Sequence, residues 1–199
     1  MKKKFSFAIL LITLTSIASC TKDNTDPVSD EQIIFNGNEI GSGIQEFEIT
    51  EDHTIKKGTY ILKGWVYITD GATLTIEAGT IIKGDKDTKA ALIVERGGKL
   101  IAQGTSSKPI IFTSNQAVGS RKPGDWGGLV ILGKAVNNKT EMIIEGGLRS
   151  MHGGTSNEDN SGIISYVRVE FAGYPFATDQ EINGITLGSV GSGTQIDHV

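Results

Sequence analysis

Two stretches of the chain repeat one another, GATLTIEAGTIIKG at residues 71–84 and GGKLIAQGT at residues 97–105. Gly71 matches Gly97 and Leu74 matches Leu100, both at an offset of 26, and Gly79-Thr80 matches Gly104-Thr105 at an offset of 25. Self-similarity at a period of roughly 20–50 residues is typical of solenoids, in which each repeat packs on its neighbours. The repeat therefore predicts a fold of stacked turns of chain.

The residues around the repeat predict short β-strands. From Ile44 onward, apolar and polar residues alternate in short runs that Gly, Asn and Asp interrupt, without a helical i, i+3, i+4 stripe. Such strands fit either a sandwich of hairpins or a parallel coil. Two-residue hairpin signals are sparse apart from Asp70-Gly71, and the same turn chemistry returns in each copy. We therefore predict an all-β parallel β-helix over residues 44–199, with cap strands at 47–68 and an early turn at 71–84.

One expected strand is apolar on both faces. Leu129-Val130-Ile131-Leu132 has no polar member, which indicates burial on both sides. The candidate cover is the glycine-rich segment 137–160, here called the excursion, because a loop of that length in a compact fold is usually functional or a cover. We expect Trp126 to pack under the excursion.

A second repeat lies near the last residue of the sequence. Ile164-Ser165-Tyr166-Val167 returns as Ile196-Asp197-His198-Val199 at an offset of 32. The second copy stops in mid-strand, whereas a solenoid requires a polar cap at each end. We expect the chain to be a fragment, truncated at its C-terminus, of a longer β-helix.

The first residues have the anatomy of an export signal. A basic start at Lys2–Lys4 precedes an apolar run at residues 5–14 that is too short to span a bilayer. The stretch ending at Cys20 resembles the lipobox of bacterial lipoproteins, in which this Cys carries the acyl chains; the alternative is an ordinary signal peptide with a coincidental Cys. We expect a lipoprotein signal peptide at 1–19 and a flexible tether with the entry to the cap at 20–43.

The resemblance to lipoproteins also implies an address. Thr21, rather than Asp, follows the Cys, which in that family favours the outer membrane. Lys22-Asp23 and Asp26 resemble the surface-export signals of some Gram-negative lipoproteins, although a solvated tether would look the same. We therefore expect a lipid-anchored protein of the outer membrane that is exposed at the cell surface.

Charge and cysteine content exclude several classes of partner and site. Without Lys2–Lys4, the balance of 19 basic against 23 acidic residues becomes 16 against 23, which argues against nucleic acid and anionic membrane surfaces. Cys20 is the single cysteine, so an internal disulfide and a thiolate zinc site are excluded.

Several stretches carry a family resemblance: residues 58–64, 71–80, 126–133 and 166–173. They resemble secreted and outer-membrane lipoproteins with a right-handed, pectate-lyase-like parallel β-helix, from about Glu48 to Val199. The resemblance implies the architecture and no particular activity. Polysaccharide lyases of this fold use clustered Asp, Arg or Lys on one strand face, and that cluster cannot be placed here residue by residue. No catalytic residue is therefore assigned.

Candidate sites each have a simpler structural explanation. Arg168 and Glu170 alternate with apolar residues and point outward together, which suits a grip on an acidic sugar or an ordinary ion pair. Tyr174 and Phe176 lie in a loop between turns and are candidate ligand contacts. The other aromatic candidates for a sugar-stacking platform are Trp65, Trp126, Tyr60 and Tyr67.

Metal and phosphate sites have weaker support. Asn157-Glu158-Asp159-Asn160 is rich in oxygen ligands, so Glu158 and Asp159 are candidates for Ca²⁺, and Asp85 with Asp87 is a lesser pair. We expect no other cofactor. The histidines at 53, 152 and 198 are scattered, and His152 reads as a loop residue. The run 188–193 lacks the Lys of a phosphate loop and reads as a corner.

Three functions remain open. The leading hypothesis is a surface module for binding, adhesion or structure, directed at carbohydrate or another surface partner. The alternative is a polysaccharide lyase or glycoside hydrolase whose catalytic residues lie largely beyond residue 199, and the third is a spacer without a ligand. A charged cluster stacked over two or three turns would favour the enzyme, and aromatics with variable loops would favour binding.

Overall fold

The computed structural model describes residues 35–199 except 44–45, 146–147 and 178–179. Most strands belong to three sheets. Sheet A contains, in order, β1 (Phe35–Asn36), β2 (Glu39–Ile40), β5 (Thr59–Leu62), β8 (Ile81–Gly84), β11 (Ile110–Ser114) and β16 (Val167–Val169). Sheet B contains β3 (Phe47–Ile49), β6 (Trp65–Ile68), β9 (Ala91–Val94), β12 (Gly128–Leu132) and β19 (Ile185–Gly188). Sheet C contains β4 (His53–Ile55), β7 (Thr73–Ile76), β10 (Lys99–Gln103), β15 (Gly162–Ser165) and β20 (Gln195–Asp197).

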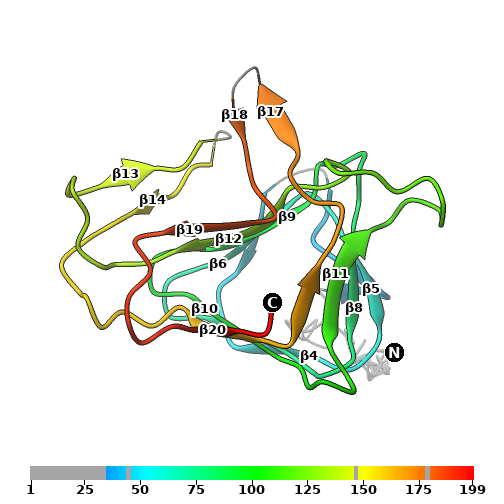
Figure 1. The fold of residues 1–199 in the computed structure, drawn as a ribbon, viewed down its shortest axis with the longest axis horizontal. Helices are drawn as coiled ribbons and strands as arrows, with labels where there is room; N and C mark the ends of the chain where they lie inside the picture. The colour runs from blue at the N-terminus through cyan, green and yellow to red at the C-terminus, as the bar shows by residue number, and fades with distance from the viewer. Residues whose placement is uncertain (1–34, 44–45, 146–147, 178–179) are drawn as a thin grey trace, which may run out of the picture.

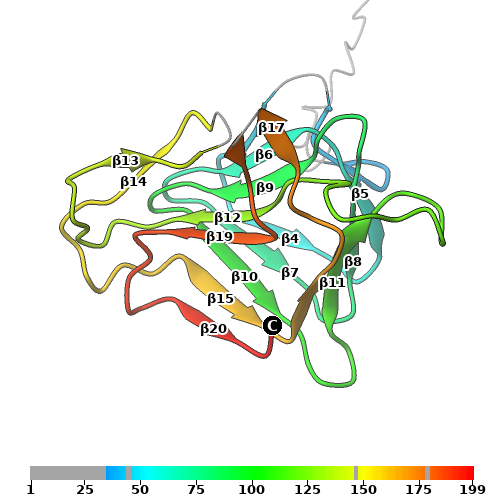
Figure 2. The ribbon, with the colours of Figure 1, turned by 45° about the horizontal axis from the view of Figure 1, so that its top comes forward.

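The chain visits sheet B, then sheet C, then sheet A in each turn, and the strands of successive turns pair in parallel. Figure 1 shows the three sheets as three walls around one interior, and Figure 2 shows the strands stacked within each wall. This is a right-handed parallel β-helix, so the predicted fold class is confirmed. The described residues include no helix of the length and apolarity needed to cross a membrane.

The repeat at an offset of 26 reflects this stacking. Leu74 and Leu100 lie opposite each other in β7 and β10, and the amide of Gly71 donates to the carbonyl of Gly97 at 3.2 Å. The match of Gly79-Thr80 to Gly104-Thr105 is wrong, because β8 and β11 pair at an offset of 30 (Ile81 opposite Ile111). The loop around Thr105 and Lys108, closed by its own antiparallel bridge, accounts for the extra residues.

The predicted cap is also wrong. The strands between Phe47 and Ile68 belong to ordinary turns, because β3 pairs in parallel with β6 and β4 with β7. The first strands of sheet A are instead the antiparallel hairpin β1–β2, and β2 then pairs in parallel with β5. β1 is therefore the edge strand of sheet A.

Inward-facing apolar side chains stack into one core. Each strand of sheet B directs alternate residues inward, as with Val66 and Ile68 of β6 or Leu129 and Ile131 of β12. Trp126 belongs to this inner core and does not lie under the excursion as expected. Its ring stacks on Phe112 with centroids 6.3 Å apart, and its Nε1 donates to the carbonyl of Glu170 at 2.8 Å.

The outer face of sheet B is covered, as predicted. Tyr67, Ile93 and Val130 point outward and pack with Leu148 of the excursion in a second cluster. The excursion connects β12 to β15 and contains the antiparallel hairpin β13 (Met142–Ile143) and β14 (Met151–His152). Ile182, beside the hairpin β17 (Pro175–Ala177) and β18 (Gln180–Glu181), joins the same cluster. Figure 1 shows both hairpins projecting from the coil.

The second predicted repeat is confirmed. Ile164 lies opposite Ile196 and Ser165 opposite Asp197. Tyr166 and His198 take the same left-handed backbone conformation, with φ of 49° and 51°, and their rings stack 4.1 Å apart. Equivalent corners of successive turns therefore share both backbone shape and side-chain packing.

Candidate ligand-binding cleft

A cleft of about 470 Å³ opens where sheet B turns into sheet C, beside the excursion. Its lining residues come from two consecutive corners and from the excursion: Asp70, Glu95, Arg96, Arg149, Ser150 and Met151. The corner residues follow β6 and β9 directly, so the stacking of the turns fixes their positions. The excursion supplies the opposite wall.

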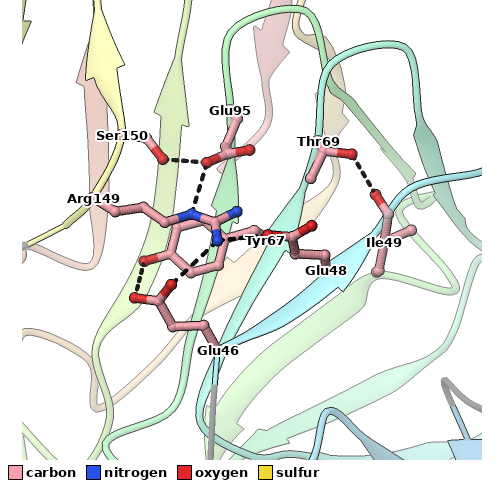
Figure 3. A network of polar contacts seen from close by, with 8 residues as sticks. All are labelled: Glu46, Glu48, Ile49, Tyr67, Thr69, Glu95, Arg149 and Ser150. Carbon is pink, nitrogen blue, oxygen red and sulfur yellow. Dashed lines mark hydrogen bonds and ion pairs between the residues drawn. The ribbon is translucent and has the colours of Figure 1, made fainter.

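Arg149 holds the excursion against the coil (Figure 3). Its guanidinium lies over the ring of Tyr67, with Cζ 4.1 Å from the ring centroid. It donates to Glu48 at 2.6 Å, to Glu46 at 3.2 Å and to Glu95 at 3.2 Å. Three carboxylates, two from β3 and the residue before it and one from the corner after β9, therefore converge on one cation.

The same network shifts the pKa values of Tyr67 and Arg149. Burial, followed by the charge of Glu46, raises the pKa of Tyr67, so this phenol stays protonated and donates to Glu46 at 3.3 Å. Partial burial lowers the pKa of Arg149, but hydrogen bonds to Glu48 and Glu95 outweigh it and raise the pKa above its ordinary value. Arg149 is a permanent cation.

Further ion pairs complete the walls of the cleft. Arg96 donates to Glu141 at 2.7 Å and to the carbonyl of Gly153 at 3.0 Å, which ties the corner to the excursion. Lys134, which follows β12, contacts Asp70 at 3.1 Å. Charged side chains therefore stack along this corner over three consecutive turns.

A second cavity of about 530 Å³ adjoins the first. Met151 lines both cavities, and the other lining residues come from the first half of the excursion: Lys139, Glu141, Met142 and Ile143. Ile143 and Met151 lie opposite each other in the β13–β14 hairpin, and both are exposed. Ile143 and Met151 thus form an exposed apolar surface, here called the apolar shelf, that extends the charged cleft.

His152 follows Met151 in β14 and is a buried strand residue, not the loop residue that the sequence suggested. Its Nδ1 lies 2.9 Å from the hydroxyl of Ser189, and its ring packs on Gly188, where a Cβ would clash with it at 2.6 Å. Burial, with a smaller contribution from Arg96, lowers the pKa of His152. Through these contacts with Gly188 and Ser189, the imidazole connects the excursion to the end of β19 and the corner that follows.

The fold and the match to known sequences agree. Residues 47–199 match the family described as the pectate-lyase like beta helix domain. The chain belongs to this family. No curated protein and no solved structure matches the chain. The pectate-lyase-like fold is thus shown, and this fold by itself does not imply one particular activity.

Arg168 and Glu170 lie on sheet A's side of the pectate-lyase-like coil, away from the cleft's lining. They form the ion pair that the sequence allowed, with Nε of Arg168 3.1 Å from Glu170, whose other oxygen accepts from Thr113 at 2.9 Å. Burial raises the pKa of Glu170, but the hydrogen bonds from Arg168 and Thr113 outweigh it and lower the pKa. A ligand-binding role for this pair stays a prediction.

None of the acidic candidates for Ca²⁺ lines the cleft. The Asp159 carboxylate is buried and accepts from the amide of Lys134 at 3.0 Å, while Glu158 is exposed. Asp85 accepts from the hydroxyl of Thr88 at 2.9 Å, which closes the polar loop containing Asp87. The described residues contain no group of three or more His, Cys, Asp or Glu side chains positioned to hold a metal.

The remaining candidates are described only in part. Tyr174 is partly buried, with Nζ of Lys89 5.2 Å from its ring centroid. The side chain of Phe176, and Cys20 with the whole export signal, lie outside the described residues. Among the other aromatics, Tyr67 is buried beneath Arg149, and Trp65 packs against the same outer cluster.

Sequence reasoning found the excursion but missed the cleft. Arg149 contacts Glu46 and Glu48 across 103 and 101 residues of sequence, and no local pattern links them. A usable signal did exist, because the repeat aligns Asp70-Gly71 with Arg96-Gly97 at the offset of 26. Charged residues at equivalent corner positions lie one above the other in a coil.

Proposed function

We propose that this chain is a lipid-anchored module of the outer-membrane surface that binds carbohydrate in the cleft between the coil and the excursion. The expected anchor is Cys20, and the expected tether ends before β1, because residues 35–40 form the β1–β2 hairpin of sheet A. The rigid coil then presents the cleft to ligands outside the membrane. The pectate-lyase-like scaffold supports this proposal, because coils of this kind offer long faces with fixed side chains.

The observation that carries the proposal is the preorganised polar lining of the cleft. Ion pairs and hydrogen bonds fix Arg96, Arg149, Glu95 and Ser150 at the corner and the excursion. Fixed donors and acceptors beside an apolar shelf suit a sugar, which presents hydroxyl groups around a less polar ring. Side chains that are already ordered lose little entropy when a ligand binds.

Binding of the mature protein to a panel of neutral, cationic and anionic polysaccharides tests the proposal. Arg96→Gln should weaken binding at least about fivefold, because Arg96 lines the cleft and links both its walls. Arg168→Gln is the matched control, since Arg168 also pairs with one glutamate but lies on sheet A. Loss of binding in Arg168→Gln alone would move the site to the Arg168–Glu170 pair.

The anchor is tested separately by fractionation of cells. Cys20→Ala should release the protein from the membrane fraction, because acyl chains on that residue would provide the attachment. A variant that remains in the membrane fraction would contradict lipid anchoring at Cys20. The result is independent of whether the cleft binds sugar.

A second candidate function is polysaccharide cleavage on the same scaffold. The specific observation in its favour is the charged stack of Asp70, Arg96 and Lys134 over three turns. Against it, Asp70 is the one carboxylate of that stack and is paired with Lys134 at 3.1 Å, whereas most glycoside hydrolases use two carboxyl groups that flank the scissile bond. Release of reducing ends or unsaturated sugars from any bound polysaccharide would establish cleavage.

A further inference from the structure

We infer that the cleft selects saccharides that carry free amino groups and discriminates against polymers of uronic acids. This inference rests on the proposed carbohydrate-binding function and names the class of ligand. It depends on three features: the charge balance around the cleft, the ion pairs that already occupy its cations, and the carboxylate oxygens that can still accept a hydrogen bond.

The charge balance of the ion-paired network around the cleft is negative. Three cations contribute to the cleft and its ion pairs, Arg96, Lys134 and Arg149. Five carboxylates pair with them: Glu46, Glu48, Asp70, Glu95 and Glu141. The ion-paired network around the cleft therefore carries two negative charges in excess. The residues that line the cleft itself are balanced, with Asp70 and Glu95 against Arg96 and Arg149.

The cations are already engaged. Arg149 donates to three carboxylates and stacks on Tyr67, and Arg96 donates to Glu141 and to a backbone carbonyl. The carboxylate of a uronic acid would have to compete with these fixed partners. Each displaced glutamate would then remain near the new anion, in a site partly shielded from water, where like charges repel more strongly than in bulk water.

Acceptors remain for a cationic ligand. Oε1 of Glu95 accepts both from Arg149 and from Ser150, and the described residues give its Oε2 no partner. Oδ1 of Asp70 contacts Lys134, and its side chain is 76% exposed at the rim. An ammonium group supplies three donors to such oxygens and neutralises part of the excess charge.

Three oligosaccharides of similar length test the inference on the mature protein: β-1,4-linked glucosamine, its fully N-acetylated form, and α-1,4-linked galacturonate. Measured by calorimetry at low salt, the amine form should bind at least about tenfold more tightly than the galacturonate, with the neutral form between them. Raising the salt concentration should reduce that difference, because screening weakens exposed charges.

A charge variant sharpens the test. Asp70→Asn should weaken binding of the amine form about threefold and strengthen binding of the galacturonate, with little effect on the neutral form. Asp87→Asn is the matched control, because Asp87 is an exposed aspartate in the loop between β8 and β9. Crossed effects of this kind do not arise from a loss of folding.

The outcomes separate the two proposals. Equal or tighter binding of galacturonate overturns the inferred preference but leaves carbohydrate binding intact. Binding of none of the three, together with no binding in the wider panel, overturns the proposed function itself. The ordering amine, neutral, acidic, with the crossed effect of Asp70→Asn, supports both.

Discussion

Gly84→Ala tests whether the core is packed as the coil requires. Gly84 ends β8, and a Cβ at this position would lie 2.5–2.6 Å from three atoms of the Trp126 side chain. Trp126 is fully buried, stacked on Phe112 and hydrogen-bonded to the carbonyl of Glu170. The indole has to move for a methyl group to fit.

The expected cost follows from these contacts. Overpacking of a buried site costs about 1–3 kcal/mol, and a weakened indole hydrogen bond about 1 kcal/mol more. Replacing a glycine whose φ is not positive stabilises the protein by about 0.5 kcal/mol, because the unfolded chain loses freedom. We therefore expect Gly84→Ala to lower the free energy of unfolding by about 2–3 kcal/mol.

Urea denaturation followed by tryptophan fluorescence measures this cost. The native emission should also change, since Trp126 is one of only two tryptophans. Gly71→Ala is the control: its φ is +87° with no atom within 4 Å of the added Cβ, so only backbone strain of about 1 kcal/mol is expected. An unchanged stability and an unchanged emission spectrum of Gly84→Ala would refute the packing described for the core.

Other predictions concern the excursion. Leu148→Ala should lower the free energy of unfolding by about 2 kcal/mol and expose the excursion to proteolysis before the coil unfolds, because Leu148 is 3% exposed and packs against sheet B. Ile143→Ala is the control, because Ile143 is 57% exposed and its loss should change stability by less than about 0.5 kcal/mol. Equal effects of the two substitutions would contradict the role of the excursion as a cover of sheet B. Burial and the charge of Arg96 lower the pKa of His152 in the folded protein. Below pH ~6.5 the unfolded chain therefore binds a proton at His152 that the folded chain does not bind. Stability should fall as the pH drops below that value, by up to about 1.4 kcal/mol per pH unit. His152→Gln should remove this part of the fall, and His53→Gln should retain it; the same pH profile in both variants would refute the assignment.

The coil could be predicted from the sequence because each turn repeats the same short pattern of residues. A Gly in the corner and alternating apolar residues recur wherever one turn lies on the next, as Leu74 on Leu100 shows. The pattern fails where insertions change the spacing: strands of sheet B pair at offsets from 19 (Phe47 opposite Val66) to 56 (Leu129 opposite Ile185). Stacking requires that the strands pair, but it allows the connections between them to vary in length.

The side on which Trp126 packs could not be predicted, because an aromatic residue beside two glycines fits either face of a corner. The inner position depends on Gly84, which is 42 residues away in sequence and leaves room for the indole. The cleft was missed for a similar reason, since Arg149 finds its carboxylates about 100 residues earlier. Contacts between separate turns and an insertion have no local sequence pattern.

Hydrogen–deuterium exchange with and without a bound saccharide tests most directly that the cleft is the ligand site. We expect slower exchange at residues 95–98 and 148–152, the two walls of the cleft, and little change elsewhere in the coil. Protection confined to the strand of Arg168, or to the region of Tyr174, would contradict it and place the ligand on another face.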